Sequence, residues 1–350
     1  MTTTDGLQTP HFRAADPQSF RIPVRGRPFL AGSSHESFPE TVPDAGGMIP
    51  TVQAEPGPDA PAEWATRLRQ LLDQALPMAG GVLVRGLPLT DKAGFETLVR
   101  SLGYDQAGYR GGIAVRKRDA GVALNASEED PRVTLSPHNE MAYLPDYPRR
   151  IFFFCEVAAE EGGEVPVNDI RETAAVIPAE ILDRFRSRGI RYYRALPAVS
   201  TDGEIGWADT FGSDDRVEVE RHLAESGYDY AWDGAGRLRY SYRREAFTAH
   251  PETGAELWFN QVTELHSSYW RCHPGFAGDL PDEAYPATTA YGDGTPIEED
   301  LIAFLRGALW RTSRAVRMRP GDVLALDNQV LQHGRLAYRG RRKHYVSLGR

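Results

Sequence analysis

Apolar residues recur at helical spacing before residue 103 and at strand-like spacing after it. Residues 62–76 and 92–102 carry the period of amphipathic helices, and Asp91 stands where its side chain can cap the second helix. Between them, residues 80–87 form a short apolar run with glycines at either end. This run predicts a strand that is buried on both faces.

The rest of the chain alternates short β-type runs with Gly, Pro and Asp. The predicted strands span residues 113–115, 151–157, 165–168, 192–194, 238–242, 257–260, 323–326 and 343–348. Helical patterns interrupt them at 178–188 and 298–310, and more weakly at 214–226. Many short strands separated by turn residues are typical of a sandwich or barrel, so we expect a mainly β protein with flanking helices.

Residues 1–61 differ from both regions. They are rich in Pro, Gly, Ser and Thr and show no sustained period, which predicts an irregular arm along the surface. A chain of 350 residues is long for one domain, but an elaborated β-sandwich can use that length. We therefore expect one domain over residues 62–350, with helical inserts.

Composition excludes several classes of protein. The 41% apolar and 25% charged residues are those of an ordinary globular protein, and the net charge of -9 disfavours nucleic acid as a partner. Cys155 and Cys272 lie far apart and outside any CxxC spacing, so neither a disulfide framework nor a thiolate metal site is expected. The first residues lack a basic segment followed by an apolar core, and no apolar run could span a membrane, so a cytoplasmic location is expected.

The first candidate for chemistry is the segment Ser-Pro-His-Asn-Glu at residues 136–140. Residues two apart on an extended segment project to the same side, so His138 and Glu140 can reach one metal ion together. The alternative is an ordinary core or surface histidine beside a solvated carboxylate, because such short motifs often occur by chance.

A second candidate lies near the C-terminus, where residues 321–335 are typical of a turn, a buried strand, an Asx-rich corner and then His333. A third ligand from this position would complete a site of two histidines and one carboxylate, which leaves metal positions open for a chelating co-substrate and dioxygen. That ligand set suits iron(II) oxygenases. The alternative is that His333 only packs at the end of a strand.

The order of motifs along the chain resembles the taurine dioxygenase-like (TauD/TfdA) family. After the HxE segment come Gly-Gly-Glu at 162–164, Trp-Phe-Asn-Gln at 258–261, Tyr-Gly-Asp-Gly at 291–294, and Gly-Asp-x-x-x-x-Asp-Asn ahead of His-Gly-Arg at 321–335. The resemblance covers residues 80–350 and is closest to the syringomycin-hydroxylase-like branch, which acts on amino acids in natural-product pathways. It implies a double-stranded β-helix (jelly-roll) core, bound Fe(II), dioxygen as oxidant and 2-oxoglutarate as co-substrate.

The resemblance also implies roles for individual residues. Related halogenases replace the carboxylate ligand by a small residue, so Glu140 argues for hydroxylation or another oxidation rather than chlorination. Arg342 matches the family's arginine that pairs with the distal carboxylate of 2-oxoglutarate, and Arg341 is the second choice because a one-residue slip reverses the side-chain direction. A solvated basic turn is the alternative. Val165 stands where the family usually has a threonine that hydrogen-bonds the co-substrate, and Val346 where some members have a second arginine.

Several polar residues are candidates for contacting the substrate. Asn260 and Gln261 end a predicted strand, Arg335 directly follows His333-Gly334, and Asn139 and Tyr143 flank the HxE pair. Arg110 and His266 are weaker candidates for the same role.

The pattern as a whole predicts an Fe(II)/2-oxoglutarate-dependent hydroxylase of a small substrate. The resemblance indicates an amino acid, either free or tethered to a peptidyl carrier protein. A desaturase or cyclase on the same scaffold stays open, as does a non-catalytic jelly-roll protein that keeps a metal site. A zinc hydrolase is disfavoured because the chain has no HExxH motif.

Overall fold

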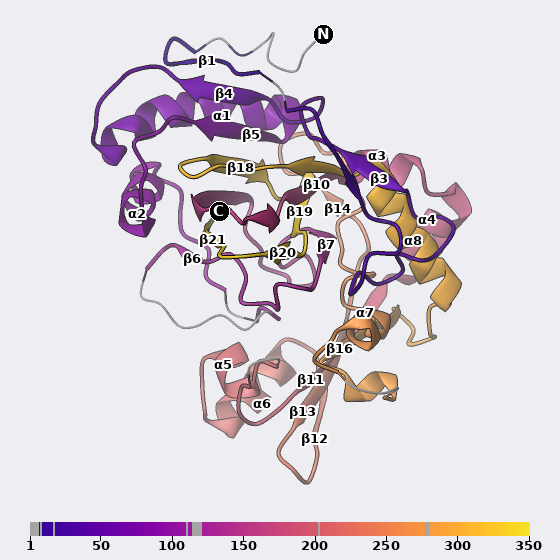
Figure 1. Ribbon diagram of the computed structural model, residues 1–350. Coiled ribbons are helices and arrows are strands. Elements are labelled where there is room, and N and C mark those ends of the chain that lie inside the picture. The colour runs from indigo at the N-terminus through magenta and orange to yellow at the C-terminus, as the bar shows by residue number, and fades with distance from the viewer. Residues whose placement is uncertain are drawn as a thin grey trace.

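Two β-sheets face each other at the centre of the computed structural model, which describes residues 7, 9–16, 18–109, 111–113, 121–201, 204–276 and 280–350 (Figure 1). The larger sheet has seven strands in the order β1 (Phe12–Ala14), β4 (Thr51–Ala54), β5 (Gly81–Arg85), β18 (Val323–Asp327), β8 (Arg150–Val157), β21 (Lys343–Gly349) and β6 (Leu124–Asn125). The smaller sheet has four, in the order β17 (Arg314–Val316), β10 (Val165–Asp169), β19 (Leu331–Arg335) and β7 (Leu135–His138). All neighbouring strands are antiparallel except the β4–β5 pair.

The larger sheet is buried on both faces, and this explains its continuous apolar runs. On β8, Ile151 and Phe153 belong to the core between the two sheets, together with Val167 of β10. The intervening Phe152 and Phe154 belong to the core on the other face, beneath the helices α1 (Ala65–Ala79) and α2 (Lys92–Ser101). Every side chain of the strand therefore finds an apolar partner.

The helices flank this pair of sheets. The 3-10 turn η1 (Pro61–Trp64) leads into α1, and the side chain of Asp91 caps α2 by accepting a hydrogen bond of 2.8 Å from the backbone N–H of Gly94, as the sequence predicted. On another side lie α3 (Ile170–Ala175), α4 (Ala179–Arg188) and α8 (Glu299–Thr312) (Figure 1).

A third sheet projects from the lower part of the molecule in Figure 1. Its order is β12 (Asp229–Trp232), β13 (Leu238–Arg244), β11 (Ile190–Leu196) and β16 (Ala287–Tyr291), and α5 (Trp207–Phe211) and α6 (Arg216–Glu225) lie beside it. The remaining elements are α7 (Ser267–Cys272), η2 (Asp282–Ala284) and the two-stranded ribbons β2 (Arg21–Pro23) with β3 (Thr41–Pro43), β14 (Thr248–Ala249) with β15 (Glu256–Leu257), and β9 (Glu161–Gly162) with β20 (Tyr338–Arg339).

A mainly β architecture with flanking helices is confirmed, but two local predictions differ from the structure. The stretch 1–61 is not irregular throughout, because it contains β1 to β4, and β1 and β4 extend the larger sheet. These strands are three or four residues long, too short to show a period. The strand expected at 257–260 ends at Leu257. Of the strand expected at 113–115, only residue 113 lies within the described part.

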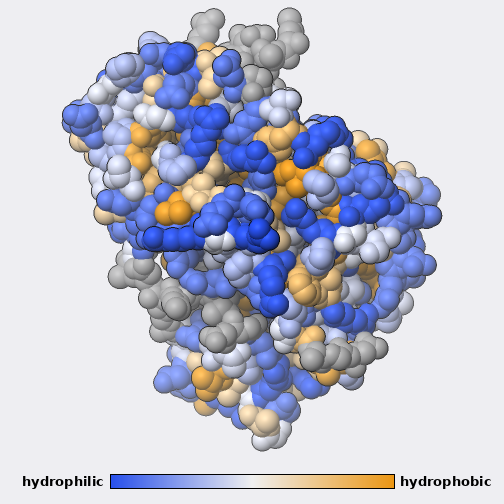
Figure 2. All heavy atoms as spheres, in the orientation of Figure 1, coloured by the Kyte–Doolittle hydropathy of each residue, from blue (hydrophilic) through white to orange (hydrophobic). Residues whose placement is uncertain are grey.

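No helix in the described part of the chain combines the length and the apolar character needed to cross a bilayer. Figure 2 shows a face that is mostly hydrophilic, with small and separate apolar patches. Both cysteines are free, Cys155 buried and Cys272 half-buried.

Candidate metal centre

The two histidines of the candidate site are cross-strand neighbours. In the β7–β19 pair, His333 lies directly opposite His138, and the two ring centroids are 4.6 Å apart. The ring of Phe153, on the facing sheet, lies 4.9 Å from that of His333. Strand pairing therefore brings together two side chains that are far apart in sequence, and it places them in the core between the sheets.

Glu140 lies just beyond the end of β7 and is held there through its backbone. The side chain of Asn328 accepts a hydrogen bond of 2.7 Å from the N–H of Glu140 and donates one of 3.0 Å to its carbonyl. The same amide donates to the carbonyl of Pro148 at 2.7 Å. The next residue, Met141, has a φ of 58°, in the left-handed region that non-glycine residues rarely adopt. Asn328 and this turn aim the carboxylate of Glu140 at the histidines.

The three side chains fit a metal ion. Their potential ligand atoms all lie within 4.8 Å of one another, and Nε2 of His333 is 3.4 Å from Oε2 of Glu140. Nδ1 of His138 bonds the carbonyl of Ser136 at 2.9 Å, which places its hydrogen there and leaves the lone pair of Nε2 for a metal. Burial and the nearby His333 lower the pKa of His138, although Glu140 raises it, so the ring is neutral as a metal ligand must be.

These ligands open into a cavity of about 170 Å³ that also receives Arg342. Nε of Arg342 donates to the carbonyl of Gly163 at 3.1 Å, and Nη2 lies 2.9 Å from Nδ1 of His344. Gly163 has a φ of 72°, and a Cβ there would lie 3.0 Å from Cδ of Arg342, so the Gly-Gly-Glu motif makes room for this arginine. Burial and the neighbouring Arg335 lower the pKa of Arg342 to about 10, which still leaves it charged at neutral pH.

The other predicted anchor residues take different places. Arg341 is exposed and does not line the cavity, so the geometry favours Arg342 as the partner of an anionic co-substrate. Val165 does line the cavity and is buried, which places an apolar side chain where the family usually offers a hydroxyl.

Of the predicted substrate contacts, Gln261, Tyr143 and Arg335 line the cavity and two others do not. Asn260 instead bonds the backbone: it donates to the carbonyl of Ala246 at 3.0 Å and accepts from the N–H of Val262 at 3.1 Å. Its role as a substrate contact is therefore not supported, because the chain turns after Leu257 and the side chain satisfies that turn.

Asn139 also lies outside the cavity. It is fully buried, donates to the carbonyl of Asn328, and its own carbonyl accepts a hydrogen bond from Gln261. Its place is beneath the metal ligands. His266 lies outside the cavity as well, capping α7 through Ser268, and Arg110 lies outside the described residues.

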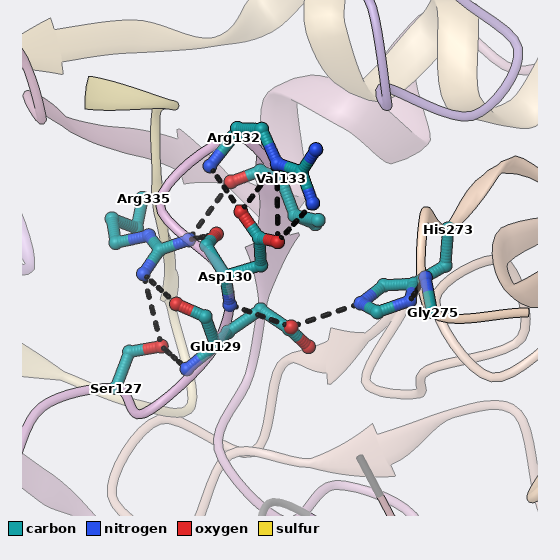
Figure 3. A network of polar contacts seen from close by, with 8 residues as sticks. All are labelled: Ser127, Glu129, Asp130, Arg132, Val133, His273, Gly275 and Arg335. Atoms are coloured by element: carbon teal, nitrogen blue, oxygen red, sulfur yellow. Dashed lines mark hydrogen bonds and ion pairs between the residues drawn. The ribbon is translucent and has the colours of Figure 1, made fainter. Parts of the chain in front are cut away.

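Arg335 holds a loop in place along the cavity wall (Figure 3). Its Nη1 donates to the carbonyl of Glu129 at 2.8 Å, and its Nη2 donates to the carbonyls of Asp130 and Val133 at 2.6 and 2.9 Å. From the other side, Nε2 of His273 lies 2.9 Å from the carboxylate of Glu129. The guanidinium is therefore occupied by the protein itself, which weakens the prediction that it binds a substrate carboxylate.

Several residues that line the cavity carry no recognisable signal in the sequence. They are Tyr109 and Ile113, Glu264 just before α7, and Tyr269 and Trp270 within α7. Their spacing has no recognisable motif, and only the position of the last three after the Trp-Phe-Asn-Gln stretch could have drawn attention to them.

Glu264 is enclosed by protein but keeps accessible surface in the cavity. Burial raises the pKa of this carboxyl group, whereas the hydroxyl of Thr263 and the charge of Arg306 lower it. The hydroxyl of Thr263 donates a hydrogen bond of 2.6 Å to it.

Comparison with known proteins agrees with this geometry. Residues 47–348 match the family described as "Taurine catabolism dioxygenase TauD, TfdA family". The dapdiamide synthesis protein DdaC of Enterobacter agglomerans is 30% identical over 281 residues, covering 79% of this chain and 84% of that protein. A clavaminate synthase-like protein of Arabidopsis thaliana is 28% identical over 287 residues, covering 80% and 84%.

Among solved structures, PvcB of Pseudomonas aeruginosa aligns over 98% of this chain and 95% of its own, with a TM-score of 0.45 and 14% identity. The family match extends over most of the chain and includes all three candidate ligands and Arg342. The chain belongs to the TauD/TfdA family of Fe(II)/2-oxoglutarate-dependent dioxygenases.

Proposed function

We propose that this protein hydroxylates an amino acid, free or tethered to a peptidyl carrier protein, using Fe(II), 2-oxoglutarate and dioxygen. The observation that carries the proposal is one cavity that holds His138, Glu140, His333 and a half-buried, charged Arg342. The likeness to a dapdiamide synthesis protein supports a small-molecule pathway as the setting.

The residues of the cavity have separate roles in this proposal. The two imidazoles and the carboxylate would hold iron(II), which supplies the oxidation of substrate by dioxygen when 2-oxoglutarate is present. Arg342 would bind the distal carboxylate of 2-oxoglutarate through the part of its guanidinium that Gly163 and His344 leave available. Phe153 and Val165 line the same cavity and exclude water around the reacting groups.

We also infer that the two facing sheets wind as a jelly roll, the fold implied by the sequence. The antiparallel order of both sheets and the metal ligands between them support it. Glu140 keeps a carboxylate in the ligand set, which supports oxygen insertion or desaturation rather than halogenation.

The proposal is tested by matched arginine variants. Arg342→Ala should raise the KM for 2-oxoglutarate at least ten-fold, because a buried guanidinium partner is worth about 1.5–3 kcal/mol. Arg341→Ala removes an equal charge from the exposed neighbouring position and should leave that KM within two-fold. Equal KM values for the two variants would contradict the anchor.

The reaction itself is measured by oxygen consumption and succinate release with Fe(II) and 2-oxoglutarate, in the presence of candidate amino acids. Mass spectrometry separates a hydroxylase, which adds one oxygen atom, from a desaturase or cyclase, which removes two hydrogen atoms. His138→Ala should abolish both metal binding and turnover. Succinate release that persists without His138 would contradict the assigned centre.

A further inference from the structure

Not every carboxylate of the cavity belongs to the metal centre or to an ion pair within the protein. Four glutamates of the described residues line it: Glu128, Glu129, Glu140 and Glu264. Glu140 belongs to the metal ligands, and Glu129 bonds His273 and the N–H of Asp130. That leaves Glu128 and Glu264.

Their surroundings differ. Glu128 is exposed and accepts a hydrogen bond of 2.5 Å from the amide of Asn125. Glu264 is half-buried and lines the same cavity as His138. The hydroxyl of Thr263 donates to it, and no ion pair joins it to any cation of the described residues within 4.0 Å.

The nearest compensating charge is Arg306, but its guanidinium is committed elsewhere. It donates to the hydroxyl of Ser268 at 2.8 Å and to the carbonyl of Thr263 at 2.5 Å. It does not line the cavity and makes no ion pair with Glu264 within 4.0 Å. A carboxylate enclosed by protein and lacking a directly bonded cation gains most from a ligand that brings one.

The adjacent wall also suits a cation. Tyr269 and Trp270, a few residues further along the chain, present aromatic side chains to the same cavity. The faces of such rings attract ammonium groups, and carboxylate with aromatic rings is a common combination for binding them. Carboxylate, aromatic wall and metal therefore share one enclosed space.

We propose that Glu264 binds a primary ammonium group of the substrate and so makes the enzyme selective for amine-bearing molecules. This inference rests on the proposed function, since it assigns one end of the substrate of that oxygenase. An ammonium held by Glu264 would lie in the cavity that His138, Glu140 and His333 also line, with the neighbouring C–H bonds in the same space as the metal ligands. Glu264 is a specificity-determining residue in this view.

The test compares ligand pairs that differ at one amine. The probes are L-aspartate with L-malate, L-leucine with L-2-hydroxyisocaproate, L-phenylalanine with L-3-phenyllactate, and L-lysine with L-norleucine. Binding is measured by calorimetry with protein loaded anaerobically with Fe(II) and 2-oxoglutarate. Wild-type protein should bind at least one amine at least ten-fold more tightly than the member of the pair that lacks that amine.

The variant Glu264→Gln keeps the side-chain shape and removes the charge. It should weaken binding of that amine at least ten-fold and bring the two members of the pair within three-fold of each other. Glu128→Gln removes an equal charge at the exposed rim and should keep the wild-type preference. Circular dichroism checks that both variants are folded.

Three results would overturn the inference: wild-type protein binds no amine probe, it binds both members of every pair equally, or Glu264→Gln keeps the preference. Should Glu264→Gln fail to fold, the wild-type pairs alone decide. The proposed function has its own readout, the iron-dependent conversion of 2-oxoglutarate to succinate by wild-type protein, so the two can fail separately.

Discussion

Asn328 offers a direct test of how the carboxylate ligand is positioned. It is fully buried and does not touch the candidate metal site with its own side chain; it holds the backbone of Glu140 on both sides. Replacing it by alanine removes both of those hydrogen bonds and a third one to Pro148. We expect both the stability of the protein and its affinity for metal to fall.

The magnitudes follow from the number of contacts. Each of the three lost partners leaves a buried polar group unsatisfied, which costs about 1–3 kcal/mol, so Asn328→Ala should lower the free energy of unfolding by about 3–9 kcal/mol. Freeing the carboxylate from its fixed position should weaken metal binding about 10–100-fold, the usual effect of removing a group that orients a ligand. Asn328→Asp is a milder second variant, because its side chain can still accept from the N–H of Glu140.

Asn168 is the matched control. It is also fully buried and makes three hydrogen bonds, to the carbonyl of Leu309 and to the hydroxyls of Thr312 and Thr173. Asn168→Ala should therefore lose similar stability. Its side chain points to the opposite face of β10 from Val167, the residue paired with His333, so metal affinity should change less than three-fold.

Urea unfolding of metal-free protein, followed by circular dichroism, measures stability, and anaerobic calorimetric titration with Co(II) measures metal affinity. The proposed role of Asn328 is wrong if Asn328→Ala lowers the free energy of unfolding as much as Asn168→Ala does but binds Co(II) as tightly as wild type. It is also wrong if the two variants lose Co(II) affinity by the same factor, since the loss would then follow from general destabilisation.

Three further predictions concern neighbouring positions. Val165→Thr should lower the KM for 2-oxoglutarate in steady-state assays, because it restores the hydroxyl that the family usually offers to the co-substrate. It should also lower the free energy of urea unfolding by about 1–2 kcal/mol, because the new hydroxyl is buried. An unchanged KM would show that the threonine's hydrogen bond to 2-oxoglutarate does not matter in this protein. Gly334→Ala should lower both Tm and Co(II) affinity, because a Cβ there would lie 2.3 Å from the carbonyl oxygen of Leu135 and push β19 away from β7; a wild-type Tm would refute this. Burial and Arg342 hold the pKa of His344 well below 6.5. As pH falls below about 6.5, the unfolded state therefore takes up a proton that the folded state does not, and the free energy of unfolding decreases. His344→Gln should reduce this decrease between pH 6.5 and 5 by up to about 1.4 kcal/mol per pH unit, and an unchanged slope would contradict the prediction.

The sequence predicted those parts of the site that depend on local geometry. His138 and Glu140 follow from a spacing of two on one extended segment, and the structure keeps them together. The approach of His333 depends on the pairing of β7 with β19, which local pattern does not encode. The sequence therefore offered His333 only as a candidate third ligand, and the family resemblance strengthened that prediction. The family resemblance likewise placed Arg342, whereas the role of Gly163 in making room for it became visible only in the structure.

Two of the predicted substrate contacts have side chains that the protein itself engages, for physical reasons of the same kind. Asn260 was expected at the end of a strand facing the metal, but the strand ends at Leu257 and the backbone then consumes the amide. Arg335 was expected to be available because it follows His333, yet the loop at 127–133 supplies enough carbonyls to occupy it. In both cases backbone carbonyls of another segment accept the hydrogen bonds that the side chain was expected to donate to the substrate.

The metal centre and the substrate side of the cavity come from different parts of the fold. The two parts should therefore differ in which amino-acid substitutions they tolerate. His138 and His333 are held by strand pairing, and Glu140 by Asn328, so small movements there cost buried hydrogen bonds. The part of the cavity wall that contains Glu264 comes from the irregular segment between β15 and α7. Side chains there can change without disturbing the hydrogen bonds between paired strands. Substitutions in that wall should therefore alter which substrate binds while leaving Co(II) affinity intact, whereas substitutions at Asn328 should do the reverse.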